Sequence, residues 1–325
     1  MNNTQIYKKT IKFSLWRLLW DFLAIVAFVG FSAAGFVVAN QSSGNGLIGL
    51  AIGAVLGGIS AYLILHFLAY TYTAGQIAMM TEGVTTGKLP DNPVAAGRKI
   101  VKERFATVAA YYAVTGIIKG IFSQIGQGIT AVGKAVGGDT GGAVGGTISS
   151  AIQTVVAYLC DCCLGWVFYR KDEKATRATL EGAVIFFKHG KTLAKNLGRV
   201  FGMGALSLLI IGGIFAGITY LILQAMPDVM GSLSAEVAEA IARNGNSVPE
   251  LVSNPTTFTV ICSLISGVII WSTIHSTFVR PFILVGVLRN FMKSGIENIP
   301  KESEFAELDK KSAKFKKLHS EVAAE

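Results

Sequence analysis

Residues 47–70 read LIGLAIGAVLGGISAYLILHFLAY, a run of 24 residues without a single Asp, Glu, Lys or Arg. As a helix rising about 1.5 Å per residue, this run is about 36 Å long and can cross the roughly 30 Å hydrocarbon core of a bilayer. Backbone N–H and C=O groups find no water in lipid, so a segment that crosses it must satisfy them internally, as a helix does. The run therefore predicts a transmembrane helix.

Similar apolar runs recur along the chain and predict about six spans. The whole sequence is 51% hydrophobic and only 15% charged, with a mean hydropathy of +0.52, which is rare for a soluble protein. We predict an all-α polytopic transmembrane helix bundle over residues 1–284 and a charged, helical cytoplasmic tail over 285–325. Lys119 lies in the third run, for which a re-entrant or surface-lying helix is the alternative. The predicted spans are residues 18–39, 47–70, 105–125, 148–168, 200–223 and 258–278.

The positive charge orients these spans. All but three of the 29 Lys and Arg residues fall at the N-terminus, in the segments after the second and fourth spans, or after the sixth span. Basic residues concentrate in cytoplasmic loops, so we expect both termini in the cytoplasm. This topology accounts for the net charge of +9 without nucleic acid. The basic connectors are expected to lie as helices on the inner membrane surface and to meet anionic lipids of the bilayer.

Glycine marks a predicted packing surface. Gly49, Gly53 and Gly57 repeat every four residues and so lie on one face of the second span, where another backbone can approach closely. The partner is either another helix of this chain or a second subunit, so a homo-oligomer or a membrane complex is expected. The glycine-rich stretch 133–146 has two readings, a packed helix or a flexible loop.

Ionisable side chains in or beside the spans are candidate functional residues, because charge is expensive in lipid. A cluster of Asp161, His66 and His275 would offer exchangeable proton or cation sites, with Asp21 and Arg280 nearer the cytoplasmic boundary. The structural alternative pairs Asp161 with Arg280 and Asp21 with Arg17, and hydrogen-bonds each histidine at the interface.

The chain also suggests a repeat of three units, each a basic interfacial helix followed by a transmembrane hairpin. Lys9-Thr10-Ile11 before Arg17 resembles Lys191-Thr192-Leu193 before Arg199 in type and spacing. Parallel repeats of this kind occur in transporters. Chance recurrence of basic flanks in a multi-pass protein explains the same pattern.

The runs CDCCLGWVFY (160–169) and ATLEGAVIFFKHGKTLAK (178–195) carry a resemblance to known proteins. With them the chain resembles a group of uncharacterised bacterial multi-pass integral membrane proteins, best over about residues 72–199. In architecture alone it is similar to six-helix transporter halves. The resemblance implies a bacterial inner-membrane location and no particular activity.

Motifs of soluble enzyme chemistry are absent from the sequence. It has no phosphate-cradling loop, His-Glu-x-x-His motif or nucleophile elbow, and its four cysteines show no zinc spacing. We therefore expect no catalytic residues, metal or cofactor. The sequence favours a channel or secondary transporter for a small solute or ion. An oligomeric membrane scaffold or accessory subunit is the alternative, and an intramembrane enzyme comes third.

Overall fold

A computed structural model describes residues 1–324 apart from 107–108, 122–156, 195–196 and 244–246. Every regular element in this described part is a helix, which confirms the all-α prediction. The chain forms two units, residues 1–198 with 281–325, and residues 199–280. Predicted features that lie wholly or partly in the gaps, namely 133–146 and the adjoining parts of 105–125 and 148–168, fall outside the described residues.

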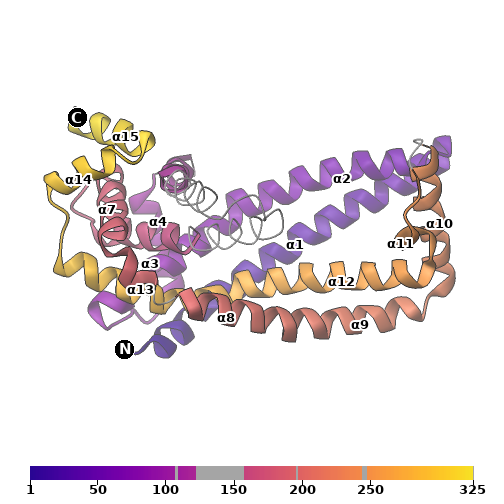
Figure 1. Cartoon of the computed structure of the whole chain (residues 1–325), viewed down its shortest axis with the longest axis horizontal. Coiled ribbons are helices and arrows are strands. Elements are labelled where there is room, and N and C mark those ends of the chain that lie inside the picture. The colour runs from indigo at the N-terminus through magenta and orange to yellow at the C-terminus, as the bar shows by residue number, and fades with distance from the viewer. Residues whose placement is uncertain (107–108, 122–156, 195–196, 244–246, 325) are drawn as a thin grey trace, which may run out of the picture. The chain divides into compact units, whose positions relative to one another are not determined.

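The first unit begins with a long helical hairpin. Helix α1 (Asn3–Ser43) turns at Gly44 into α2 (Gly46–Leu63), and the two run side by side (Figure 1). Gly44 has φ 68°, a left-handed conformation that suits glycine, and its N–H donates to the carbonyl of Asn40, which ends α1. Helix α2 then passes through the π-helical segment η1 (Ile64–Ala69) into α3 (Tyr70–Thr86).

The glycines of α2 lie directly against α1. A Cβ built on Gly53 would come within 2.9 Å of the carbonyl carbon of Phe31, and one on Gly57 within 2.8 Å of the Cα of Phe28. At Gly49 the neighbouring backbone is that of Gly35. Contact is therefore backbone to backbone, and any side chain at these positions would push the helices apart.

The outward-facing side chains of this hairpin are apolar. Leu15, Phe22, Val38, Ile52 and Val55 are each about half exposed or more, and many similar residues surround them. Exposed apolar patches of this extent are unfavourable in water but are expected where lipid covers the helix. The hairpin thus has the surface of a membrane-spanning element.

Beyond the hairpin, the first unit forms a packed bundle that we call the basal domain (Figure 1). Its core contains side chains that are completely buried, among them Phe13, Met79, Trp166, Leu180 and Phe291. The domain consists of residues 3–14 of α1, α3, α4 (Pro93–Arg104), the helix Ala157–Tyr169, α7 (Ala175–Ala194), residues 281–297 of α13 (Arg280–Glu297), α14 (Glu302–Asp309) and α15 (Ala313–Ala323).

Both ends of the chain belong to this domain. The guanidinium of Arg289 on α13 donates to the side-chain oxygen of Asn3 at 2.6 Å and to the carbonyl of Met1 at 2.8 Å. Helices α14 and α15 contact α7. The N-terminus and the C-terminal helices therefore sit on the same side of the first hairpin.

The second unit contains another hairpin. Helix α8 (Leu197–Ser207) leads through the π-helical segment η2 (Leu208–Gly212) into α9 (Gly213–Gln224), which runs beside α12 (Pro255–Ile274) (Figure 1). Between them lie α10 (Pro227–Arg243) and α11 (Glu250–Ser253), and a third π-helical segment, η3 (His275–Val279), follows α12. Glycine again permits close packing, since a Cβ on Gly267 would lie 2.6 Å from the carbonyl oxygen of Gly212.

Four helices in the described ranges are long and apolar enough to cross a membrane, whereas the sequence predicted six spans. They are Asn3–Ser42, Ile48–Thr86, Val200–Gln224 and Pro255–Glu297, and they contain the first, second, fifth and sixth predicted spans. The described parts of the other two predicted spans are a helix over 109–121 and the helix Ala157–Tyr169.

The described helix Ala157–Tyr169 lies in the basal core. Cys162, Cys163, Trp166 and Val167 are completely buried, and Gly165 lies against Leu288 of α13. Helix α7 likewise differs from the membrane-surface helix expected from its sequence. Its apolar face packs inside the protein, with Gly182 against the sulfur of Cys163.

Candidate functional site

His66, one of the predicted intramembrane residues, lies in the π-helical segment η1. Its ring stacks on Tyr112 with centroids 3.6 Å apart and on Tyr62 at 4.9 Å. The hydroxyl of Tyr112 donates to the backbone carbonyl of His66 at 3.0 Å. A π-helical turn disturbs the regular hydrogen bonding of a helix and often marks a functional position, and here a tyrosine supplies a partner to one carbonyl in it.

His275 opens the π-helical segment η3 in the second unit. Its Nδ1 lies 3.0 Å from the hydroxyl oxygen of Ser207, to which Trp271 Nε1 also donates at 3.0 Å. Ser207 comes from α8 and the other two from the opposite helix, so this polar triad joins the two arms of the second hairpin. Both histidines singled out from the sequence thus lie in π-helical segments.

The remaining predicted polar residues are placed as follows. Arg17 Nε lies 3.8 Å from the carboxylate of Asp21, so this predicted pairing one turn apart on α1 is present. Asp161 lies half-buried in the first unit, and Arg280 and His275 belong to the second. A joint cluster of Asp161, His66, His275 and Arg280, and the pair Asp161–Arg280, stay predictions.

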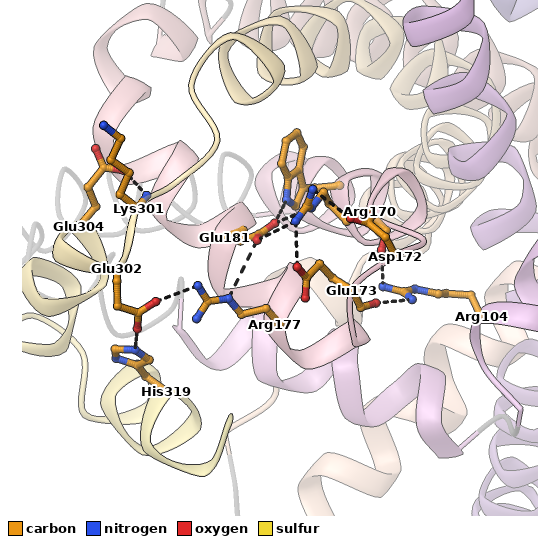
Figure 2. A network of polar contacts seen from close by, with 11 residues as sticks. Arg104, Arg170, Asp172, Glu173, Arg177, Glu181, Lys301, Glu302, Glu304 and His319 are labelled. Atoms are coloured by element: carbon orange, nitrogen blue, oxygen red, sulfur yellow. Dashed lines mark hydrogen bonds and ion pairs between the residues drawn. The ribbon is translucent and has the colours of Figure 1, made fainter. Parts of the chain in front are cut away.

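The most buried charge network in the described chain centres on Glu181 of α7, whose side chain is only 3% exposed (Figure 2). Its Oε2 accepts hydrogen bonds from Trp166 Nε1 at 2.9 Å and from Arg170 Nε at 3.0 Å. Arg170 also reaches Glu173 at 3.1 Å. A buried carboxylate needs such partners, because removing charge from water without them costs several kcal/mol.

Arg104 joins this network to α4. Its guanidinium donates to the backbone carbonyls of Glu173 at 2.7 Å and Arg170 at 3.0 Å (Figure 2). Partial burial lowers the pKa of Arg104, although the negative charges of Asp172 and Glu173 oppose this. The turn between the helix Ala157–Tyr169 and α7 is therefore held by two guanidinium groups, that of Arg104 from α4 and that of Arg170 from the turn itself. This arrangement is typical of a network that stabilises the fold.

The C-terminal helices are held onto α7 by a second set of charges, which we call the C-terminal clip. Arg177 donates to Glu302 at 2.9 Å and stacks on the ring of Phe305 at 4.3 Å, and Lys188 pairs with Glu304. His319 contacts Glu302 at 2.7 Å through Nε2 (Figure 2). Phe305 is completely buried, so apolar packing accompanies the charges.

The contacts of the C-terminal clip change the pKa values of His319 and Glu302. Burial disfavours the charged form of His319, but hydrogen bonds to Glu302 and Asp309 outweigh it and raise the pKa of His319. Hydrogen bonds from Arg177 and His319 lower the pKa of Glu302. Protonated His319 and ionised Glu302 therefore stabilise each other when the clip is closed.

The exposed face of α4 carries a basic hollow. Ala95, Arg98, Lys99, Lys102 and Glu103 line an open depression of about 570 Å³. Lys99 lies 3.8 Å from Glu103, and Arg98 lies over the ring of Tyr72, with its guanidinium carbon 5.4 Å from the ring centroid.

No group of three or more His, Cys, Asp or Glu residues suited to a metal ion occurs in the part of the chain that the structure describes.

Sequence reasoning missed the Glu181 network, the clip and the basic hollow as sites. Glu181 and Trp166 stand 15 residues apart in the sequence, and only the packing of α7 on the helix Ala157–Tyr169 brings them together. The sequence feature that could have indicated the buried network is Glu181 itself, an acidic residue inside the otherwise apolar stretch Ala178 to Ile185.

Comparison of the chain with protein-family models, curated protein sequences and solved structures finds no match.

Proposed function

We propose that this protein is an integral membrane scaffold, a non-catalytic anchor that holds the helical basal domain at the membrane surface and joins it to a second copy or to another membrane protein. Four long apolar helices fit a membrane-embedded protein, and the scaffold role is the function that the packing supports best. We further propose that the basal domain faces the cytoplasm of a bacterial cell, since most of the basic residues lie outside the outer loops.

The observation that carries this proposal is the continuity of the first hairpin with the basal core. Helix α1 runs unbroken from buried residues such as Ile6 and Phe13 to exposed apolar residues such as Phe22 and Val38. The segment Ile48–Thr86 runs the other way, from exposed apolar residues back to residues that are buried in the basal core. A helix that continues across the boundary links the position of the membrane directly to the domain.

The packing between α1 and α2 also favours an anchor. Backbone atoms meet at Gly49, Gly53 and Gly57, so the space between these two helices is filled by the helices themselves. A solute path would need a polar gap between helices, and this contact supplies none. The hairpin thus has the packing of a structural element.

A test uses the full-length protein with a photo-crosslinking residue at Lys293, an exposed position on α13. In native membranes we expect a discrete crosslinked product, either a dimer or one defined protein partner, and a matching complex in native mass spectrometry from nanodiscs. A strictly monomeric protein that forms no protein adduct at Lys293 or at other exposed basal positions, such as Lys316 or Glu307, would contradict the scaffold.

A second function, transport of protons or a small cation, is favoured by one observation. His66 and His275 both occupy π-helical segments, and such segments recur at functional positions in helices. Flux in reconstituted vesicles that is abolished by His66→Phe or His275→Phe, with folding retained, would support transport. Equal flux in the wild type and in protein-free vesicles would exclude it for the ion tested.

A further inference from the structure

The membrane boundary can be located on the first hairpin from burial alone. On α1, Phe13 and Ser14 are completely buried in protein, whereas Leu15 is 53% exposed and Trp16 46%. On the returning helix, Phe67 is 50% exposed, whereas Ala69 and Tyr72 are buried. Apolar side chains change from protein contact to outward exposure within about one turn on each helix.

The two transitions lie at the same height. The rings of Trp16 and Tyr72 stack with centroids 5.8 Å apart, so residue 16 of α1 is level with residue 72 of α3. Trp20 packs on the same cluster, and Tyr70 lies two residues nearer the apolar part of the same helix. Trp and Tyr are enriched where hydrocarbon meets lipid headgroups, which is the place that the burial pattern indicates.

Helix α4 is fixed at this height by close contacts. A Cβ on Gly97 would lie 2.7 Å from the carbonyl oxygen of Gly75 and 2.7 Å from Cζ of Phe13, so α4 lies against both helices at the boundary. Val94 and Ile100 pack on the cluster of Phe13, Tyr72 and Met79. The apolar face of α4 is therefore occupied by protein, and its basic face remains exposed.

The basic face places three cations around one small residue. Arg98, Lys99 and Lys102 are exposed, and Ala95, one turn before Arg98 and Lys99, leaves the hollow between longer side chains. Arg98 lies over Tyr72 and hence at the level of the aromatic residues. Glu103 is the one acid among the lining residues and pairs with Lys99 at 3.8 Å, so the lining has a net positive charge.

We propose that this hollow binds the phosphate headgroup of an anionic phospholipid of the surrounding membrane. A planar guanidinium suits the oxygens of a phosphodiester, and two ammonium groups add charge without further geometric demand. A headgroup is the source of phosphate at this height, because the acyl chains would continue along the exposed apolar side chains of the hairpin. The site goes beyond the scaffold role, since it names a lipid class and stands whether the protein anchors or transports.

The expected magnitude follows from the number of charges. A basic residue at an anionic membrane surface contributes roughly fivefold in affinity, so three together contribute on the order of 100-fold. The full-length protein in a neutral detergent is titrated with fluorescent short-chain phosphatidylglycerol and, separately, with the matching phosphatidylcholine. We expect the wild type to bind phosphatidylglycerol at least tenfold more tightly.

Two variants and a matched control locate the effect. Arg98→Gln with Lys99→Gln and Lys102→Gln should lower the affinity for phosphatidylglycerol on the order of 100-fold. Lys99→Gln with Lys102→Gln alone should lower it roughly 25-fold while keeping Arg98 over Tyr72, so that folding is preserved. The control replaces three exposed lysines of the C-terminal region by glutamine and should bind like the wild type; these are Lys310, Lys316 and Lys317.

Three results would overturn the proposal. One is wild-type affinity for phosphatidylglycerol in the triple variant. Another is displacement of the lipid by millimolar inorganic phosphate as effectively as by unlabelled lipid, which would make the hollow a site for a soluble anion. A loss of affinity shared equally by the control variant would show a general charge effect and would also reject the site.

Discussion

Gly53→Ala tests the backbone contact between α1 and α2 with the smallest possible side chain. The new Cβ would lie 2.9 Å from both the carbonyl carbon of Phe31 and the Cα of Ser32, and nearer still to the carbonyl oxygen of Phe31. Ordinary contact begins at about 3.4 Å, so the helices must separate by at least half an ångström. Overpacking of this kind costs about 1–3 kcal/mol.

Gly58→Ala is the matched control on the same helix. No atom lies within 4 Å of a Cβ at Gly58, so this change adds only the helix preference of alanine, a gain of up to about 1 kcal/mol. The same gain accompanies Gly53→Ala, and the difference between the two variants isolates the contact. We expect Gly58→Ala to be the more stable by about 1–3 kcal/mol.

The measurement is reversible unfolding of the full-length protein in mixed micelles, followed by far-ultraviolet circular dichroism. Equal stability of Gly53→Ala and Gly58→Ala would refute the close contact. A loss in both variants alike would show that the helix itself, rather than the contact, is perturbed.

Three further perturbations address the polar networks. Glu181→Gln removes the buried negative charge beside Arg170, which keeps Glu173 at 3.1 Å and Asp172 at 3.3 Å, and we expect a loss of about 1–3 kcal/mol in unfolding free energy, against almost none for glutamine at an exposed acid. The raised pKa of His319 means that its contribution to closing the clip is present below its ordinary value of 6.5 and is lost as pH rises through the folded value. Hydrogen exchange of α15 should therefore quicken, after correction for intrinsic rates, between pH 6 and 9 in the wild type but not in His319→Gln. Ser207→Ala removes the acceptor of Trp271 and should lower stability by about 0.6–1.7 kcal/mol, while Ser207→Thr retains it; unchanged melting of the alanine variant would reject that hydrogen bond.

The sequence located the apolar cores of four helices well but not their ends. The predicted span 200–223 agrees closely with Val200–Gln224, whereas the prediction 18–39 covers only the middle of Asn3–Ser42. Hydropathy reports where apolar side chains change from protein contact to outward exposure, near Leu15 on α1. The backbone hydrogen bonds of the helix continue past that point, so the helix is longer than its apolar run.

The run around Cys163 shows what hydropathy leaves undecided. An apolar stretch such as Ala157–Tyr169 has the same composition whether it meets lipid or a protein core, and only its neighbours decide. Those neighbours, α7 and α13, come from later in the sequence. For the same reason the sequence could not identify the helix that packs on Gly53. A face of small residues predicts a close backbone contact but does not tell which backbone makes it.

The central claim is that the hairpins cross the membrane and the basal domain lies in the cytoplasm. Single-cysteine labelling in intact cells tests it most directly, with the four native cysteines replaced and one cysteine introduced at Lys174, in the turn before α7, or at Gln41, near the tip of the first hairpin. A membrane-impermeant maleimide should label the cysteine at Gln41 in intact cells and the one at Lys174 only after the membrane is opened. Labelling at Lys174 from outside, with Gln41 protected, would contradict the account.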